Sequence, residues 1–293
     1  MNYKIRCLLT GTVTTDSSVE KMHSVLDAGR KIRVPVNIFY VEGPKLRLIF
    51  EAGMASSEEM NKKWGAGKHG ALPPAEGGGA ESIEKSLAEV GATTDDIQFV
   101  IPSHLHTDHA WNLDVFPRAK VIAQREEIIE AIDPPSPMRF GYSRIINTKL
   151  VSRRQPDELK IIDGDCDIAE GLKLIKVPGH TPGSQTLIVQ TEKGKVALCG
   201  QTGPSYANWF PADARLGHAL GFLKDTYNPD PLLAGTQRTY IQSMERIAGM
   251  ADIVVPTHDW RIPRRIPEQW WFSPPDEVCS RDWSKVVFKY GLI

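Results

Sequence analysis

The chain has 293 residues, 41% of them hydrophobic, which is enough for one large domain with a substantial core. Its 35 basic and 36 acidic residues leave a formal net charge of -1, so charge favours neither a nucleic acid nor an anionic membrane as partner. There is no apolar run of transmembrane length, no apolar signal-like stretch at the N-terminus and no CxxC pair among the four cysteines. Together these features predict a cytoplasmic protein.

The first third of the chain predicts strands joined by loops. Residues 3–13, 31–42 and 46–53 are short runs of β-forming residues bounded by Gly and Pro. The segment 54–80 is polar and rich in glycine, and we expect an irregular loop there.

The next segment predicts alternation between helix and strand. Residues 81–91 predict a helix, because their apolar residues fall on one stripe and a glycine follows. A buried strand is expected over 97–101, another over 120–123, and a helix over 124–132. Residues 133–160 are rich in Pro and Arg without a clear period, and we interpret them as an insertion that could cover a site.

The second half repeats this alternation. Residues 172–180, 185–192 and 195–201 are strand-like, 236–249 predict an amphipathic helix, and 252–259 predict a further strand. Strands that lead into helices in two successive halves are typical of a layered α/β protein.

A dense group of metal-ligating residues follows the strand predicted over 97–101. The segment "SHLHTDH" places His104, His106, Asp108 and His109 within six positions. Side chains at this spacing in a loop can point at one centre. Imidazole nitrogens suit zinc and similar first-row metals, and a carboxylate adds negative charge. The segment therefore predicts a metal site.

Two further histidines follow apolar strands in the same way. His180 lies in "IKVPGHTPGS", where glycines allow a tight loop, and His258 lies in "IVVPTHD". A single histidine at such a place is usually structural. Because both resemble the first cluster in their placement, we interpret both as further metal ligands.

The motifs "HLHTDH", "PGHTPGS" and "VVPTHD", in this order, resemble those of the metallo-β-lactamase superfamily, and the layout is most similar to its N-acyl homoserine lactonase group. The resemblance implies an α/β fold, an αββα sandwich with a metal site at one edge of its two sheets. We expect residues 1–293 to form a single domain of this kind, with insertions at about 54–80, 133–160 and 203–235.

The resemblance also implies which residues bind metal. One set of ligands would be His104, His106 and His180, and a second would be Asp108, His109 and His258. Asp108 would also orient the attacking hydroxide. The expected cofactor is Zn²⁺, as one or two ions, with Mn, Fe or Co as alternatives. Glu51, where the family often has an aspartate, would hydrogen-bond a ligand histidine from behind.

The chain departs from the family pattern at two places. The family normally has an aspartate that bridges the two metals after the strand predicted over 195–201, and this chain has Gln201 there. A neutral amide oxygen is a weaker ligand than a carboxylate, so we expect weaker binding of at least one metal. The group also tends to have a tyrosine that binds the substrate carbonyl, and the nearest candidate is Tyr206.

These features predict a metal-dependent hydrolase of a small molecule, in which a metal-activated hydroxide opens a lactone or a cyclic amide. The alternatives are a hydrolase of another class, such as a thioesterase or a hydrolytic dehalogenase, and, with less support, an oxidoreductase or a non-catalytic metal-binding protein. Neither a nucleic acid nor a membrane is expected as partner, and a homo-oligomer is left open.

Overall fold

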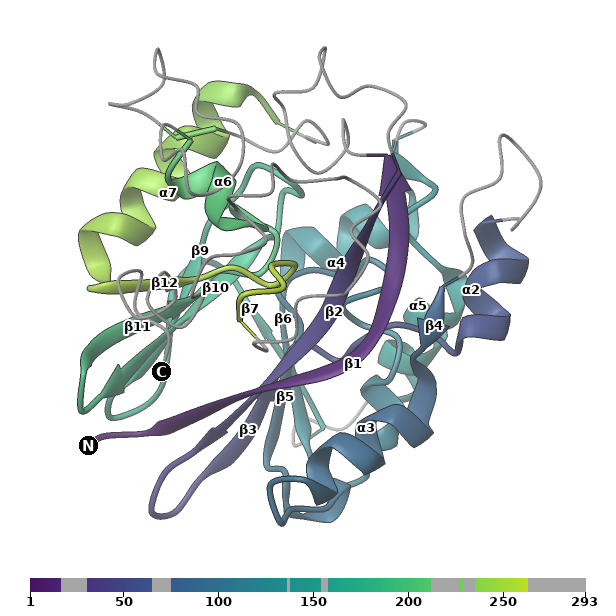
Figure 1. Cartoon of the computed structure of the whole chain (residues 1–293), viewed down its shortest axis with the longest axis horizontal. Helices are drawn as coiled ribbons and strands as arrows, with labels where there is room; N and C mark the ends of the chain where they lie inside the picture. The colour runs from purple at the N-terminus through teal and green to yellow at the C-terminus, as the bar shows by residue number, and fades with distance from the viewer. Residues whose placement is uncertain are drawn as a thin grey trace, which may run out of the picture.

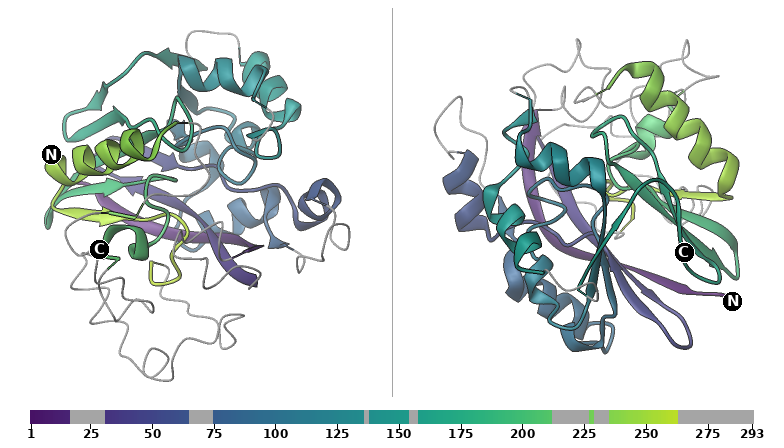
Figure 2. Two further views of the ribbon diagram at one scale, coloured as in Figure 1. Left: turned by 90° about the horizontal axis from the view of Figure 1, so that it is seen from above. Right: turned by 180° about the vertical axis from the view of Figure 1, so that it is seen from behind.

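The computed structural model describes residues 1–16, 31–64, 75–135, 138–153, 158–211, 227–228 and 235–262. Two β-sheets face each other, and helices cover the outer side of each (Figures 1 and 2). This is the αββα sandwich expected from the motifs. No helix in the part of the chain that the structure describes is long and apolar enough to cross a membrane.

The larger sheet has the strand order β4-β1-β2-β3-β5-β6-β7. Its strands are β1 (Lys4–Asp16), β2 (Lys31–Glu42), β3 (Arg47–Phe50), β4 (Glu76–Gly77), β5 (Phe99–Ile101), β6 (Lys120–Gln124) and β7 (Leu159–Ile162). The pairs from β1 to β3 are antiparallel, whereas β3, β5, β6 and β7 run parallel. Parallel strands end at a common edge, which places the loops after β3 and β5 side by side.

The smaller sheet has the strand order β12-β11-β10-β9-β8. Its strands are β8 (Cys166–Ala169), β9 (Leu172–Lys176), β10 (Gln185–Thr191), β11 (Gly194–Leu198) and β12 (Ile253–Val255). Neighbours are antiparallel except β11 and β12, which run parallel. The loops that follow β11 and β12 therefore leave the sheet at the same end.

The helices are α2 (Ser57–Trp64), α3 (Gly79–Ala88), α4 (Arg125–Ile132), α5 (Arg144–Ser152), α6 (Tyr206–Trp209) and α7 (Gln237–Met250), with 3₁₀ turns η1 (Thr94–Asp96) and η2 (Leu113–Val115). In Figure 2, α3 lies on the outer side of the larger sheet and α7 on the outer side of the smaller one. Each sheet is thus buried on both faces.

The alternation of side chains along β2 shows how the core is divided. Phe39 and Val41 belong to the core cluster that includes the inner face of the smaller sheet, whereas Ile38 and Tyr40 pack on the opposite side, in the cluster that includes α3. All four side chains are at most 2% exposed. Because strand side chains alternate between faces, an almost continuous apolar run is what a strand covered on both sides requires.

The structure differs from the sequence-based expectation in the segments without a clear period. The expected loop over 54–80 contains α2 and β4, and the segment 133–160 contains α5. Helix α5 buries only Ile146 and Leu150, and its β-branched residues have low helix propensity, so its pattern is weak. Part of 203–235 forms α6, and most of the rest lies outside the described residues.

Ile101 is the last residue of β5 and is fully buried between the sheets, directly before the histidine loop. We predict that Ile101→Ala lowers the free energy of unfolding by roughly 2–5 kcal/mol, through lost apolar burial and the cavity left behind. Urea unfolding followed by circular dichroism measures this. Ile132→Ala, at an isoleucine that is 69% exposed, is the control and should change stability by no more than about 0.5 kcal/mol. Equal stability of the two variants would contradict the inter-sheet core.

Candidate metal site

Three loops that follow strands bring six ligating side chains to one edge of the two sheets. In each of two triads, the potential ligand atoms lie within 4.8 Å of one another. The first triad is His104, His106 and His180, and the second is Asp108, His109 and His258. The loop after β5 supplies four of these residues, and the loops after β9 and β12 supply one histidine each. The structure thus brings together the residues that the sequence singled out.

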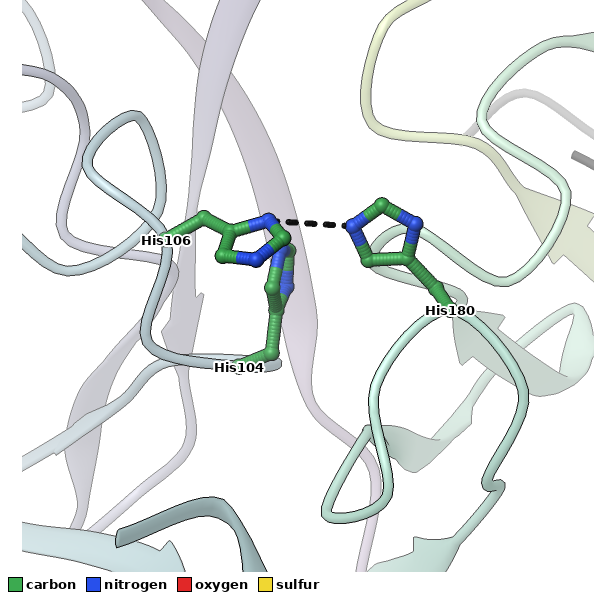
Figure 3. A group of neighbouring side chains, drawn as sticks. All are labelled: His104, His106 and His180. Atoms are coloured by element: carbon green, nitrogen blue, oxygen red, sulfur yellow. Dashed lines mark hydrogen bonds between the residues drawn. The ribbon is translucent and has the colours of Figure 1, made fainter. Parts of the chain in front are cut away.

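The geometry of the first triad suits a shared cation. His106 Nδ1 and His180 Nε2 lie 3.1 Å apart (Figure 3). Two nitrogens bound to one tetrahedral metal at about 2.0–2.1 Å would be about 3.3–3.4 Å apart. The third member, His104, has a buried Nε2 that hydrogen-bonds to none of the residues that the structure describes, while its Nδ1 lies 3.0 Å from Ser103 Oγ. A buried nitrogen lone pair without a partner is what an incoming metal ion would satisfy.

The second triad has similar spacing and adds a carboxylate. His109 Nε2 and His258 Nε2 lie 3.2 Å apart. Asp108 Oδ2 lies 3.4 Å from the first of these nitrogens and 3.7 Å from the second. The two triads adjoin each other, because the ring centroids of His104 and His109 are 4.1 Å apart. The donor set of nitrogens with one carboxylate oxygen is typical of zinc and related divalent metals.

Groups behind the second triad set which ring nitrogen faces inward. His258 Nδ1 donates to the carbonyl oxygen of Pro35 at 2.8 Å, and His109 Nδ1 donates to Glu51 Oε1 at 3.0 Å. Because both acceptors require a proton on Nδ1, the lone pair of each neutral ring is on Nε2, the atom that faces the triad. The predicted hydrogen bond between Glu51 and a ligand histidine is present. The Pro35 carbonyl had no signal in the sequence, because any residue provides such an oxygen.

Glu51 is held in an unusual backbone conformation. Its φ angle is 71°, in the left-handed region that costs a non-glycine residue about 1–2 kcal/mol. Its carboxylate is fully buried, and Oε2 accepts the backbone N–H of Ser103 at 2.9 Å. Glu51 therefore connects the loop after β3 to the loop after β5. The strained backbone conformation lies directly behind the second triad.

The charges of the second triad favour a cation. Burial alone would raise the pKa of Asp108, but the neighbouring imidazoles of His109 and His258 hold it well below its usual range. Burial lowers the pKa of His109, but the carboxylates of Asp108 and Glu51 outweigh burial and raise it to about 10. Without a metal, a proton on His109 thus balances the two carboxylates. A divalent ion would displace that proton and supply the positive charge instead.

Burial acts on two of the other ligand histidines in the direction that metal binding needs. It lowers the pKa of His104 and of His258, with the neighbouring imidazoles acting in the same direction. Both rings are therefore neutral near pH 7, and a neutral imidazole is the form that binds a metal. The other histidines of the chain, His23, His69 and His218, lie outside the described residues.

Gln201 is buried in a tight turn beyond β11. The backbone just before it, at Gly200, approaches Ser103 so closely that a Cβ atom there would lie 2.3 Å from Ser103 Cβ. The Tyr240 hydroxyl donates to the Gln201 carbonyl oxygen at 2.5 Å and accepts the N–H of Gly203 at 2.7 Å. The turn thus lies against the loop that carries the first ligands. A ligand role for the Gln201 side chain remains a prediction.

Tyr206 lies at the start of α6 and is fully buried in the core. Its hydroxyl donates to the carbonyl oxygen of Val254, in β12, at 3.3 Å. Burial raises the pKa of this phenol well above its ordinary value, with Asp259 adding to the effect. These contacts give Tyr206 a role in packing α6 against the smaller sheet. Its placement does not support the expectation that it binds the substrate carbonyl.

The chain is similar to one known family and to curated members of one enzyme group. The family model of the metallo-beta-lactamase superfamily matches residues 32–258. The chain is 30% identical over 180 residues to the N-acyl homoserine lactonase AiiA of Bacillus thuringiensis subsp. kurstaki, covering 60% of this chain and 67% of that protein. It is 26% identical over 174 residues to the N-acyl homoserine lactonase AiiB of Agrobacterium fabrum (strain C58), covering 57% and 62%.

Solved structures give the same picture at the level of the fold. One similar structure is an N-acyl homoserine lactone hydrolase with the product N-hexanoyl-L-homoserine bound at its catalytic metal centre. The TM-score is 0.66 and the sequence identity is 24%, and the match covers 92% of this chain and 100% of that chain. The dizinc quorum-quenching lactonase AidC has a TM-score of 0.59 and 18% identity, covering 88% and 87%. At these identities the likeness concerns the fold alone.

His106 contributes one nitrogen to the first triad. We predict that His106→Ala loses about one equivalent of divalent metal per chain, because two ligands do not complete a tetrahedral site, and that hydrolysis is lost with it. Elemental analysis of the purified variant measures the metal. Glu126→Ala, at a carboxylate of α4 that pairs with Lys176 at the surface, is the control and should keep the wild-type metal content. Full activity in metal-free protein would contradict the metal site.

Proposed function

The chain belongs to the metallo-beta-lactamase superfamily, and from this premise we propose that it is a lactonase, which opens a small cyclic ester such as an N-acyl homoserine lactone, or a cyclic amide. That it is a metal-dependent hydrolase follows from its family and its relatives. The observation that carries the proposal is the meeting of two ligand triads at one edge of the sheets, with a carboxylate in the second. The relatives that are N-acyl homoserine lactonases support the substrate class.

In this proposal each triad holds one divalent ion, and the ion is zinc. Nitrogen-rich donor sets suit zinc, and the similar lactonase AidC is a dizinc protein. A bound zinc ion lowers the pKa of water toward neutrality and polarises the carbonyl under attack.

Asp108 is the ligand residue best placed to act on the attacking water. Its side chain is 18% exposed, whereas those of His109 and His258 are 2% exposed. Since Oδ2 faces these two histidines, the other carboxylate oxygen can accept a hydrogen bond from water on the solvent side. The nearby imidazoles keep the carboxylate ionised, and an ionised carboxylate is a hydrogen-bond acceptor only. Asp108 thereby orients the water toward the carbonyl carbon.

The reaction balances with water as its only co-substrate. The water oxygen forms a bond to the carbonyl carbon, and the bond between that carbon and the ring oxygen breaks. The ring opens to a carboxylate and an alcohol, with one proton of the water passing to the leaving oxygen and the other released to solvent. No serine or cysteine nucleophile is required, because water is the nucleophile.

Gln201 also supports a second candidate, a hydrolase of thioesters or of haloaromatics. A neutral amide in place of the family's shared carboxylate would remove one negative charge from a two-metal site, and such a change is compatible with a reaction other than that of the relatives. We rank this candidate second, because these relatives are lactonases.

A hydrolysis screen tests the proposal. We predict that the zinc-loaded protein opens N-acyl homoserine lactones or simple γ-lactones, that a chelator abolishes the activity, and that added zinc restores it. Release of acid in weakly buffered solution measures ring opening. Turnover of a thioester or a haloaromatic without any lactone turnover would instead favour the second candidate.

Restoring the shared carboxylate should strengthen metal binding. We predict that Gln201→Asp raises occupancy of the weaker metal site, because an anion between two dications reduces their repulsion. Metal content after dialysis against limiting zinc measures the effect. Gln190→Asp in β10 adds the same charge near the opposite end of the sheet and should leave occupancy unchanged. Unchanged metal content in a folded Gln201→Asp variant would mean that Gln201 does not lie at the bridging position.

A further inference from the structure

A buried carboxylate lies behind the first triad and belongs to neither set of proposed ligands. Glu127 is in the first turn of α4 and is 1% exposed. A buried carboxylate is costly unless its oxygens accept hydrogen bonds, so its partners indicate what it does.

The partners of Glu127 come from both loops of the first triad. Oε1 accepts the backbone N–H of Leu105 at 2.9 Å, and Leu105 lies between His104 and His106 in the chain. Oε2 accepts the backbone N–H of Gly183 at 3.2 Å, in the loop that carries the third histidine. A single carboxylate thus joins two loops that are far apart in sequence and that supply opposite sides of the triad.

The approach of the second loop to α4 depends on a glycine. A Cβ atom on Gly183 would lie 2.3 Å from Glu127 Cβ and 2.4 Å from its backbone nitrogen. No side chain fits at such distances. The second glycine of "PGHTPGS" is therefore explained by contact with Glu127, in addition to the tightness of the loop.

Tyr142 extends the network to the ring of a ligand. Its hydroxyl donates to Glu127 Oε1 at 3.0 Å, and its ring contacts the His106 ring edge to face, with centroids 4.5 Å apart. The preceding residue, Gly141, accepts the backbone N–H of Thr107 at 2.9 Å. Tyr142 therefore holds the His106 ring in place, while Glu127 holds the backbone before His106 and the Gly141 carbonyl holds the backbone after it.

We propose that Glu127 is the positioning residue of the first metal triad: it holds the loop of His104 and His106 and the loop of His180 at the separation at which the three rings share one divalent ion. The proposal rests on the proposed metal site. According to this proposal, Glu127 affects the affinity of the first triad for its ion and does not affect the affinity of the second triad.

The substitution Glu127→Gln tests the proposal with almost no change in shape. Glutamine has one acceptor oxygen where the carboxylate has two, so in either orientation its amide N–H₂ faces a backbone N–H. We expect the first-triad ion to bind roughly 10–100-fold more weakly, the usual effect of removing a group that orients a metal ligand. Glu126→Gln is the matched control, since Glu126 is the preceding residue of α4 and pairs with Lys176 at the surface.

The two ions are separated by measuring each triad alone. His258→Ala leaves only the first triad intact, and His180→Ala leaves only the second. Competition with a chromophoric chelator gives the zinc affinity of each background with and without Glu127→Gln, and the absorption of the cobalt-substituted proteins reports the ligand geometry. The expected result is weakening in the His258→Ala background and none in the His180→Ala background. Equal weakening in both, or weakening in neither, overturns the proposal.

Tyr142→Phe provides a second test should Glu127→Gln fail to fold. It removes one hydrogen bond to the carboxylate and keeps the ring against His106, so the same ion should be weakened to a smaller degree. Unchanged affinity of the first-triad ion overturns the proposal. All these measurements are made without substrate. If the wild-type chain binds zinc but opens no lactone, the proposed function is wrong. The role of Glu127 is still decided by the zinc affinities.

Discussion

The site depends on one electrostatic constraint: five imidazole rings and a carboxylate converge in a space from which water is largely excluded. Their lone pairs and negative charge need a positive partner there, because polar groups buried without one are costly. In the second triad a proton on His109 meets part of this need in the metal-free protein. A divalent ion meets it better, because one ion interacts with several of these donors at once. Hydrogen bonds from the surrounding structure hold the ligand side chains in the orientation that points toward the site.

The outer hydrogen bonds serve that arrangement. Glu51 and the Pro35 carbonyl fix the rings of the second triad through Nδ1, and Glu127 fixes the backbone around the first. Each of these acceptors comes from a different part of the fold: the loop after β3, the strand β2 and the helix α4. The left-handed backbone of Glu51 shows that the fold tolerates local strain to place one of them.

Much of the fold was predictable where apolar periodicity was strong. The strand over 31–42 and the helix over 236–249 agree with β2 and α7 to within a residue, because long patterned segments leave little choice. Helix α5 was missed, since its short amphipathic pattern is stabilised by packing that a local window does not contain. The expected role of Tyr206 in substrate binding failed to gain support for a similar reason: its position in sequence says nothing of the direction in which the phenol points.

The sequence by itself determined the layered α/β architecture and the six ligand candidates, because strand periodicity and the placement of histidines after strands are local properties of the chain. Gln201 stood out only through the resemblance to the family, which normally has an aspartate there. The resemblance to the family implied the two ligand sets, and the tertiary structure showed how they meet. The packing of the two sheets brought His180, after β9, and His258, after β12, to residues 104–109. The fold also brought two ligand loops within hydrogen-bond distance of buried Glu127. A carboxylate in the first turn of a helix has no local signal of this kind, since the two backbone N–H groups that it binds lie 22 and 56 positions away.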